Sequence, residues 1–372
     1  MKSSFRLFRI AGIDIGVHYS WFFIFLLVTW SLAAGYFPQK YPNGEMTAYW
    51  IMGALTAVLL FVSVLIHEMA HSMVARAKGM QVNSITLFLL GGVSNLQEEP
   101  KQPGAEFFMA IVGPLTSLVL AVIFWGLSRI LNPGSISGAL AGYLAQINLI
   151  LAIFNLLPGF PLDGGRVLRS IIWASTGSLS KATNAAALVG RFIGWGLITY
   201  GVILALTGYV FNGLWLAFIG WFLSSTADAN RRDVTLREHF SNIKVKEVMA
   251  ASVETITPDT SVEQVVTGIL HRKYDRGIPV CQDGRLLGII TMTDIKELPK
   301  DKWATTPVER VMTRGPLYAV TPEDSVNTAL TMLAEHDINQ VIINQQEQCA
   351  GILKRADIIN YLQLSRELAK KA

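Results

Sequence analysis

The stretch MTAYWIMGALTAVLLFVSVLIHEMAH, residues 46–71, decides the fold. Residues 46–66 carry no charged side chain, and as an α-helix they are long enough to cross a hydrocarbon core of about 30 Å. The run ends at His67-Glu68-Met69-Ala70-His71. Ionisable groups are costly in such a segment, so they typically face a bundle interior and have a function there. The stretch therefore predicts a membrane helix with a functional polar end.

The HExxH pattern indicates a metal site. On an α-helix residues i and i+4 share one face, so His67 and His71 can present two imidazoles to one zinc ion. Glu68 lies beside them, where it can serve as a general base for water. The same pattern occurs on exposed helices of soluble proteins, but the apolar run before it disfavours that alternative. We therefore expect metal-dependent peptide hydrolysis.

A third ligand is available in the stretch NLLPGFPLDGGR, residues 155–166. Catalytic zinc sites typically hold three protein ligands and keep one position open. Asp163 is the best-placed carboxylate, because the two prolines interrupt the preceding helix and the glycine pair lets backbone pass close by. Such irregular backbone is tolerated at membrane depth only inside protein or at a water-filled cavity. A turn aspartate at a helix end is the alternative.

These motifs resemble the site-2 protease family of intramembrane zinc metalloproteases over residues 1 to about 228. The HExxH helix, a Gly91-Gly92 loop, a Gly113-Pro114 helix and the NxxPxxPLDGGR segment follow the order of the family. The resemblance implies hydrolysis of a peptide bond in or near a membrane-spanning segment of a substrate protein. It also implies the site residues: zinc on His67, His71 and Asp163, with Glu68 as general base and Asn155 contacting the substrate or the tetrahedral intermediate.

The resemblance leaves the roles of two positions open. Ser117 stands where relatives frequently have Asn, which leaves any polar role there open. His18, at the entrance of the first apolar segment, resembles a family feature near the active site. An interfacial or hydrogen-bonded histidine is the alternative for that position, and we assign it no metal.

Six apolar segments predict an α-helical polytopic membrane protein of about six transmembrane helices. Six crossings put both termini on one side, and the positive-inside rule makes that side cytoplasmic. The HExxH end of the second segment and Asp163 then share the cytoplasmic side. The segments are 18–37, 46–74, 105–131, 138–157, 188–208 and 211–227. The basic flanks are Lys2, Arg6, Arg9, Arg76, Lys78, Lys101, Arg166, Arg169, Lys181, Arg191, Arg231, Arg232 and Arg237.

Residues 82–96 predict a small re-entrant β-hairpin. VNSITLFLL, residues 82–90, suits a strand, and Gly91-Gly92 then turns into VSNL. A strand edge offers unpaired backbone groups, so the hairpin could take an extended substrate by strand addition. A purely structural hairpin is the alternative.

Composition divides the chain. It is 51% hydrophobic and 16% charged, with a mean hydropathy of +0.40, but nearly all the polarity lies after Asp228. We expect a transmembrane zinc metalloprotease domain at residues 1–228, a linker at 229–242, and cytoplasmic α/β modules at 243–302 and 303–372, the second with a C-terminal helix. The cytoplasmic flanks account for the net charge of +4, so no nucleic-acid partner is expected.

The polar half contains a tandem repeat. VKEVM at 245–249 recurs as VERVM at 308–312, and TPDTSV at 257–262 recurs as TPEDSV at 321–326. The repeats resemble a pair of cystathionine-β-synthase (CBS) domains, which implies binding of AMP or ATP and homodimerisation. Thr291 and Asp294 match the family's phosphate and ribose positions. Asp357 matches in the second repeat, where Lys354 replaces the hydroxyl residue. A dimerisation module with an empty cleft is the alternative.

Two other functions compete with proteolysis. One is a CBS-regulated membrane channel or transporter, which predicts repeated halves and ion-pathway residues in several helices. Instead, the ionisable groups concentrate at the HExxH motif and Asp163. The other is a metal-binding scaffold without proteolysis. In every case we expect an integral protein of the cell membrane, in contact with lipid.

Overall fold

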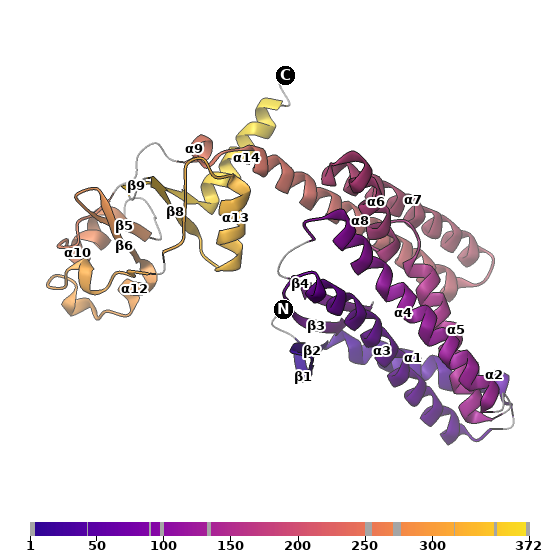
Figure 1. Cartoon of the computed structure of the whole chain (residues 1–372). Helices are drawn as coiled ribbons and strands as arrows, with labels where there is room; N and C mark the ends of the chain where they lie inside the picture. The colour runs from indigo at the N-terminus through magenta and orange to yellow at the C-terminus, as the bar shows by residue number, and fades with distance from the viewer. Residues whose placement is uncertain are drawn as a thin grey trace. The chain divides into compact units, whose positions relative to one another are not determined.

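The structure, a computed structural model, forms two compact units, Met1–Val234 and Thr235–Ala372 (Figure 1). It describes residues 4–42, 44–88, 91–96, 100–131, 135–249, 255–270, 277–315, 317–345 and 348–369. The expected linker at 229–242 is helical, because α8 (Val210–Asn242) continues through it. Each unit is described by itself below.

The first unit is helical and apolar. Within the described residues, six helices are long and apolar enough to cross a membrane, in agreement with the six predicted segments. The first runs from Ser20 to Lys40 through α1 (Ser20–Ser31), a π-helical turn and α2 (Phe37–Lys40). The others are α3 (Met46–Ala77), α4 (Pro103–Ile130), α5 (Ile136–Asn155), α7 (Leu179–Leu206) and α8.

The shorter helix α6 (Asp163–Thr176) is not among these spans but is central to the packing. It packs on α4 and α7, while α4 also packs on α3 and α5. Many large apolar side chains, among them Phe22, Val122 and Phe192, remain exposed on the helices. In a membrane protein such side chains face lipid, so the bundle is built for a bilayer.

A four-stranded sheet accompanies the helices. The predicted hairpin is present as β3 (Val82–Phe88) and β4 (Gly91–Leu96), which pair antiparallel. A second hairpin, β1 (Ser4–Ile10) and β2 (Ile13–His18), adds to it through a parallel β2–β3 pair, giving the order β1-β2-β3-β4. Neither β1 nor β2 was predicted from the sequence, where Arg6 and Arg9 indicated only a basic flank. β4 therefore lies at one edge of the sheet.

The second unit holds two βαββα modules around one five-stranded sheet of order β5-β6-β9-β8-β7. The first module contains α10 (Val262–Val265), β5 (Gly277–Gln282), β6 (Arg285–Thr291) and α12 (Met292–Lys296). The second contains β7 (Ala319–Val320), α13 (Val326–Glu335), β8 (Gln340–Gln345), β9 (Gln348–Lys354) and α14 (Arg355–Ala369). This is the architecture that the repeat predicted.

The two modules exchange the segments that precede them. Residues 245–249, which contain α9 (Val245–Val248), hydrogen-bond to the turn of the second repeat through Val245 N–H and Asp324 O, 2.9 Å apart. Conversely, Val308 N–H donates to Thr260 O in the first repeat at 2.8 Å. Two hydrophobic cores result. The inner core comprises Ile256, Val262, Val265, Ile278, Val280, Ile290, Ile295, Val308 and Met312. The outer core comprises Phe240, Ile243, Val245, Val320, Val326, Ala329, Leu333, Val341, Ile343, Leu353 and Ile358.

Candidate metal centre and nucleotide site

Three side chains that are far apart in sequence converge in the membrane unit. His67 and His71 lie one turn apart on α3, and Asp163 is the first residue of α6. Asp163 Oδ2 is 3.1 Å from Nε2 of His67 and 3.2 Å from Nε2 of His71, and the two Nε2 atoms are 3.1 Å apart. Among the described residues this is the group of His, Cys, Asp and Glu side chains that could hold a metal ion.

The spacing fits zinc. Ligands about 2.0 Å from a tetrahedral ion lie about 3.3 Å from one another, close to the separations found here. The other ring nitrogens support this orientation, since His71 Nδ1 donates to the carbonyl of Met109 at 2.6 Å. A neutral imidazole protonated at Nδ1 presents a lone pair at Nε2. The two Nε2 atoms and the carboxylate therefore point lone pairs into one space, an arrangement that a cation stabilises.

Helix α4 supports the histidines from behind. Ser117 Oγ lies 2.9 Å from Nδ1 of the buried His67, which gives a role to the position where relatives often carry Asn. Together with the Met109 carbonyl, it holds both rings with their Nε2 atoms turned inward. Such outer contacts fix the tautomer and the ring orientation of metal-binding histidines. Sequence reasoning missed Met109, because any residue supplies a carbonyl.

Two glycines make room for the site. A β-carbon at Gly113 of α4 would stand 2.7 Å from Nε2 of His67 and closer still to Nε2 of His71. A β-carbon at Gly92 of β4 would stand 2.9 Å from Cδ of the half-buried Glu68. Gly92 thus brings the β4 edge against the predicted base, and Gly113 leaves space where the ligand atoms converge. Both glycines were noted in the sequence, but these contacts were not foreseen.

The loop before Asp163 is held by close backbone contacts. A β-carbon at Gly165 would stand 2.6 Å from the carbonyl oxygen of Gly159, and closer contacts would block a β-carbon at Gly164. The N–H of Phe160 donates to the carbonyl of Ala186 on α7 at 3.2 Å. The glycine pair therefore lets the first turn of α6 press onto the loop, the close approach that the sequence predicted. This packing sets where Asp163 starts.

The other two membrane-unit residues singled out in the sequence lie outside the cluster. Asn155 is the last residue of α5 and is partly buried, and its side chain forms no hydrogen bond among the described residues. His18 ends β2, and its Nδ1 lies 2.8 Å from Oγ of Ser20. The metal group in the described part of the chain does not include His18.

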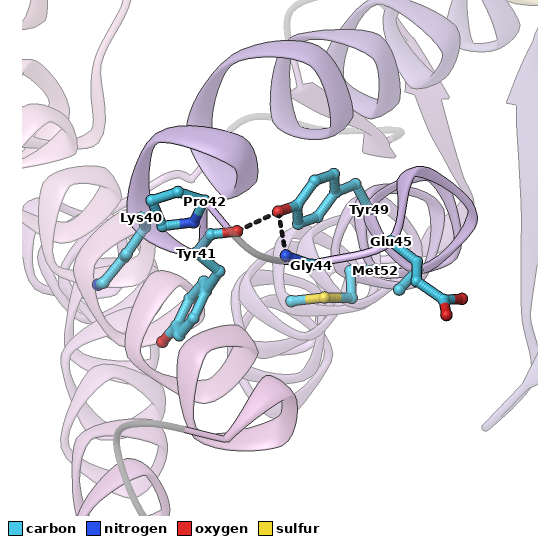
Figure 2. Close-up of a pocket in the computed structure, with 8 residues that line it drawn as sticks. Lys40, Tyr41, Pro42, Gly44, Glu45, Tyr49 and Met52 are labelled. Atoms are coloured by element: carbon cyan, nitrogen blue, oxygen red, sulfur yellow. Dashed lines mark hydrogen bonds between the residues drawn. The ribbon is translucent and has the colours of Figure 1, made fainter.

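A cavity of about 570 Å³ lies at the opposite end of α3 (Figure 2). Tyr49 lines this cavity, and its hydroxyl accepts a hydrogen bond from Gly44 N–H at 2.8 Å and donates one to the Tyr41 carbonyl. Met52, which also lines it, precedes His67 by fifteen residues, or about 22 Å of helix. The cavity contains no residue of the metal cluster, so it is separate from that site.

In the second unit, Thr291 and Asp294 contact each other at the start of α12. Asp294 Oδ2 accepts from the backbone N–H and from the hydroxyl of Thr291, both at 2.7 Å. The second carboxylate oxygen, Oδ1, accepts from the Thr313 hydroxyl at 3.1 Å. Thr313 follows the exchanged segment and was not singled out in the sequence. Asp294 therefore joins the two repeats.

The second repeat has a reduced version of this arrangement. Asp357 Oδ2 accepts the backbone N–H of Lys354 at 3.0 Å, in the same relation as Asp294 to Thr291. Because Lys354 has no hydroxyl, the hydroxyl-to-carboxylate hydrogen bond of the first repeat cannot form here. The two positions are thus equivalent in backbone geometry and different in chemistry.

Comparisons with known proteins agree with both units. The model of Peptidase family M50 matches residues 55–134 and 133–197, and the CBS domain model matches 245–301 and 308–364. "Putative zinc metalloprotease sll0528" of Synechocystis is 34% identical over 98% of this chain and 97% of its own length. "Zinc metalloprotease MJ0392" of Methanocaldococcus jannaschii is 31% identical over 99% of both chains.

One solved structure, "Site-2 Protease from Methanocaldococcus jannaschii", is 31% identical, with a TM-score of 0.42 over 61% of this chain and 95% of that one. The similarity to the two metalloproteases of Synechocystis and M. jannaschii covers both units of this chain, the helical unit and the unit with the repeat. The chain therefore belongs to the Peptidase M50 family of site-2 protease zinc metalloproteases and carries a pair of CBS domains.

Proposed function

We propose that this metalloprotease cuts a peptide bond in or near a membrane-spanning segment of a substrate protein, with one zinc ion held by His67, His71 and Asp163. The observation that carries the proposal is the convergence of two Nε2 atoms and one carboxylate oxygen within 3.2 Å of one another. This cluster forms between a candidate membrane span, α3, and the start of α6. It combines the ligands of a catalytic zinc site with a membrane location.

The protein's own groups divide the work. Zinc bound there supplies a Lewis acid and makes water more acidic. Glu68 accepts the proton of the attacking water and returns it to the leaving amine. Asn155 donates a hydrogen bond to the substrate carbonyl or to the oxyanion formed from it. The place of Asn155 at the start of the NxxPxxPLDGGR motif, as in the family, supports that assignment.

The substrate approaches as an extended strand along β4. That strand is at the sheet edge, and its Gly92 lies against Glu68. Strand edges bind extended peptides through backbone hydrogen bonds. A membrane-spanning substrate helix must first unwind locally, so we expect Gly, Pro or polar residues near the cleaved bond. The basic flanks support a cytoplasmic location for this end of the helices and for both termini.

Metal analysis combined with cleavage of membrane-spanning peptides in detergent tests the proposal. Wild-type protein is expected to hold one zinc per chain and to cut. His71→Ala and Asp163→Asn are expected to lose both properties, whereas His336→Ala, in the second unit, keeps them. Equal zinc content in wild type and Asp163→Asn would contradict the ligand assignment. Zinc content without cleavage of any peptide would leave a metal-binding scaffold.

We also propose that the CBS pair binds an adenine nucleotide, AMP or ATP, and thereby modulates cleavage, in a homodimer formed through the CBS domains. Thr291 ends β6, and Asp294 and Asp357 lie in the first turns of the helices that follow β6 and β9. A nucleotide changes activity only if it binds two states of the protein with different affinity. Cleavage with and without nucleotide therefore tests the regulation separately from binding.

A further inference from the structure

A buried ion pair lies outside the metal cluster. Arg169 of α6 donates from Nε to Oε1 of Glu106 on α4 at 2.6 Å, and a second guanidinium nitrogen also contacts that oxygen. The side chain of Glu106 is 0% exposed and that of Arg169 is 9% exposed. From the sequence, Arg169 was predicted to be one of the basic flanking residues that face the cytoplasm. Its burial shows that this arginine contacts protein instead.

Both partners are close to parts of the metal centre along the chain. Glu106 precedes Met109, whose carbonyl orients His71, by three residues on the same face of α4. Arg169 follows Asp163 by six residues on α6. The pair therefore connects the helix that orients one ligand to the helix that presents another.

Arg169 also contacts the loop on the other side of Asp163. Its guanidinium carbon lies 5.1 Å from the ring centroid of Phe160, within the range of a cation–π interaction. Phe160 precedes Asp163 by three residues and is held to α7 by its backbone hydrogen bond. Arg169, which follows Asp163 in the chain, thus contacts Phe160 just before Asp163 and also pairs with Glu106 on α4.

Stability alone is a weak explanation for this pair. Removing two charges from water costs about as much as their attraction returns, so apolar residues of similar volume often serve as well. In some proteins a buried directional pair instead fixes the relative position of two elements. Glu106 also gains from the dipole at the start of α4, but that leaves the burial of Arg169 unexplained.

We propose that Glu106 and Arg169 are positioning residues, which fix α6 against α4 so that Asp163 completes the zinc site. This inference rests on the proposed zinc ligands. Helix α6 has 14 residues and follows an irregular loop, so side-chain contacts with α4 add to the backbone packing at its first turn in fixing its position. Loss of the pair lets α6 shift while the two histidines stay on α3. The expected consequence is weaker and distorted metal binding in a folded protein.

The deciding variant replaces both charges, Glu106→Met with Arg169→Met, so that neither partner is left buried without the other. Its matched control is Arg191→Met with Asp228→Met, because that pair joins α7 and α8 in the same unit and is about 40% exposed. Thermal unfolding, zinc affinity by chelator competition and the visible absorption of the cobalt form are compared. We expect unfolding near that of wild type, zinc affinity lowered about 10- to 100-fold and an altered cobalt spectrum. The control variant is expected to keep the wild-type unfolding temperature, zinc affinity and cobalt spectrum.

The inference would be overturned if the double Met variant had the same zinc affinity and the same cobalt spectrum as wild type. Should that variant fail to fold, Glu106→Asp decides, because a shorter carboxylate must either break the pair or draw α6 toward α4. Unchanged zinc affinity in a folded Glu106→Asp protein would overturn the inference as well. Failure of the proposed ligands is recognised independently, by Asp163→Asn binding zinc as tightly as wild type.

Discussion

The backbone of Gly113 faces the imidazole of His71 so closely that a side chain at position 113 would fill the space in front of Nε2. Helix α4 thus shapes the metal centre without contributing a ligand. Its Ser117 and its Met109 carbonyl turn the two histidines, and Gly113 leaves the converging ligand atoms accessible. The geometry of the site therefore depends on α4, which supplies no ligand, as well as on α3, which carries the HExxH motif.

Gly113→Ala is expected to lose zinc, because the added methyl group overlaps the position that the ion must occupy beside His71. Zinc content should fall at least tenfold, while helix content stays at the wild-type level. Gly126→Ala is the matched control, since it lies on the same helix with no heavy atom within 4 Å of the built β-carbon. Atomic absorption of the purified proteins measures both. Full zinc occupancy in Gly113→Ala would contradict the location of the site.

Glu68→Gln is expected to abolish peptide cleavage and keep zinc near one per chain. Gln retains the shape of Glu but cannot take a proton from water, a step that contributes about 10²- to 10⁴-fold to the rate. Glu45→Gln, at the other end of α3, should cleave like wild type. Cleavage assays with parallel metal analysis separate the outcomes. Loss of zinc in Glu68→Gln would make Glu68 a ligand rather than a base.

Asn155→Ala is expected to reduce cleavage about 10²- to 10³-fold, the usual effect of removing one oxyanion donor. Zinc content should not change, because Asn155 lies outside the ligand cluster. Asn184→Ala removes an amide that contacts Arg231 elsewhere in the unit and serves as control. The comparison uses kcat/KM for one membrane-spanning peptide. Unchanged kcat/KM would show that Asn155 only ends its helix.

Asp294→Ala is expected to weaken binding of AMP or ATP by at least tenfold, the scale of losing a hydrogen bond to a charged group. Asp324→Ala makes a suitable control, because Asp324 also accepts a threonine N–H, that of Thr321, but in a turn away from α12. Titration calorimetry measures the dissociation constants. Equal affinity in wild type and Asp294→Ala would contradict the role of Asp294, and no nucleotide binding by wild type would leave the CBS pair as a dimerisation module.

Glu323 provides a pH-dependent contact in the second unit. Hydrogen bonds from Lys244 and Lys246 lower the pKa of Glu323 from its ordinary 4.5 to about 2. Because the folded pKa is the lower one, the stabilisation is complete above pH 4.5 and is lost as pH falls toward 2. The unfolding temperature of Glu323→Gln should therefore lie slightly below that of wild type at pH 7 and approach it under acid conditions. Glu335→Gln should match wild type throughout.

The membrane spans and the histidine pair could be predicted from the sequence, because both follow from regular helix geometry. His67 and His71 share a face by spacing alone, and apolar length located all six spans. Asp163 followed from its place in a broken helix. The contacts of Gly92 and Gly113 could not be predicted, because they depend on how closely separate elements approach in three dimensions. Arg169 was misjudged for the same reason, since its partner Glu106 lies 63 residues away.

The repeats show a different limit. Similar motifs at 245–249 and 308–312 indicate two modules, but they do not say which module each segment completes. The same sequence motifs would occur whether or not the two modules exchanged the segments that precede them. The role of Thr313 beside Asp294 was hidden for that reason, because it depends on the second segment packing on the first repeat.

The exchange also sets an order of events during synthesis. The inner core uses residues 256–312 only, so it can close as soon as Met312 has left the ribosome. The outer core needs Phe240 and Val245 from one end and Leu353 from the other. At about 5–20 residues per second, Val245 waits on the order of 5–20 s for Leu353. During that interval a nascent chain exposes apolar residues directly after its last membrane helix, which makes this segment the place where a chaperone or a neighbouring chain would bind first.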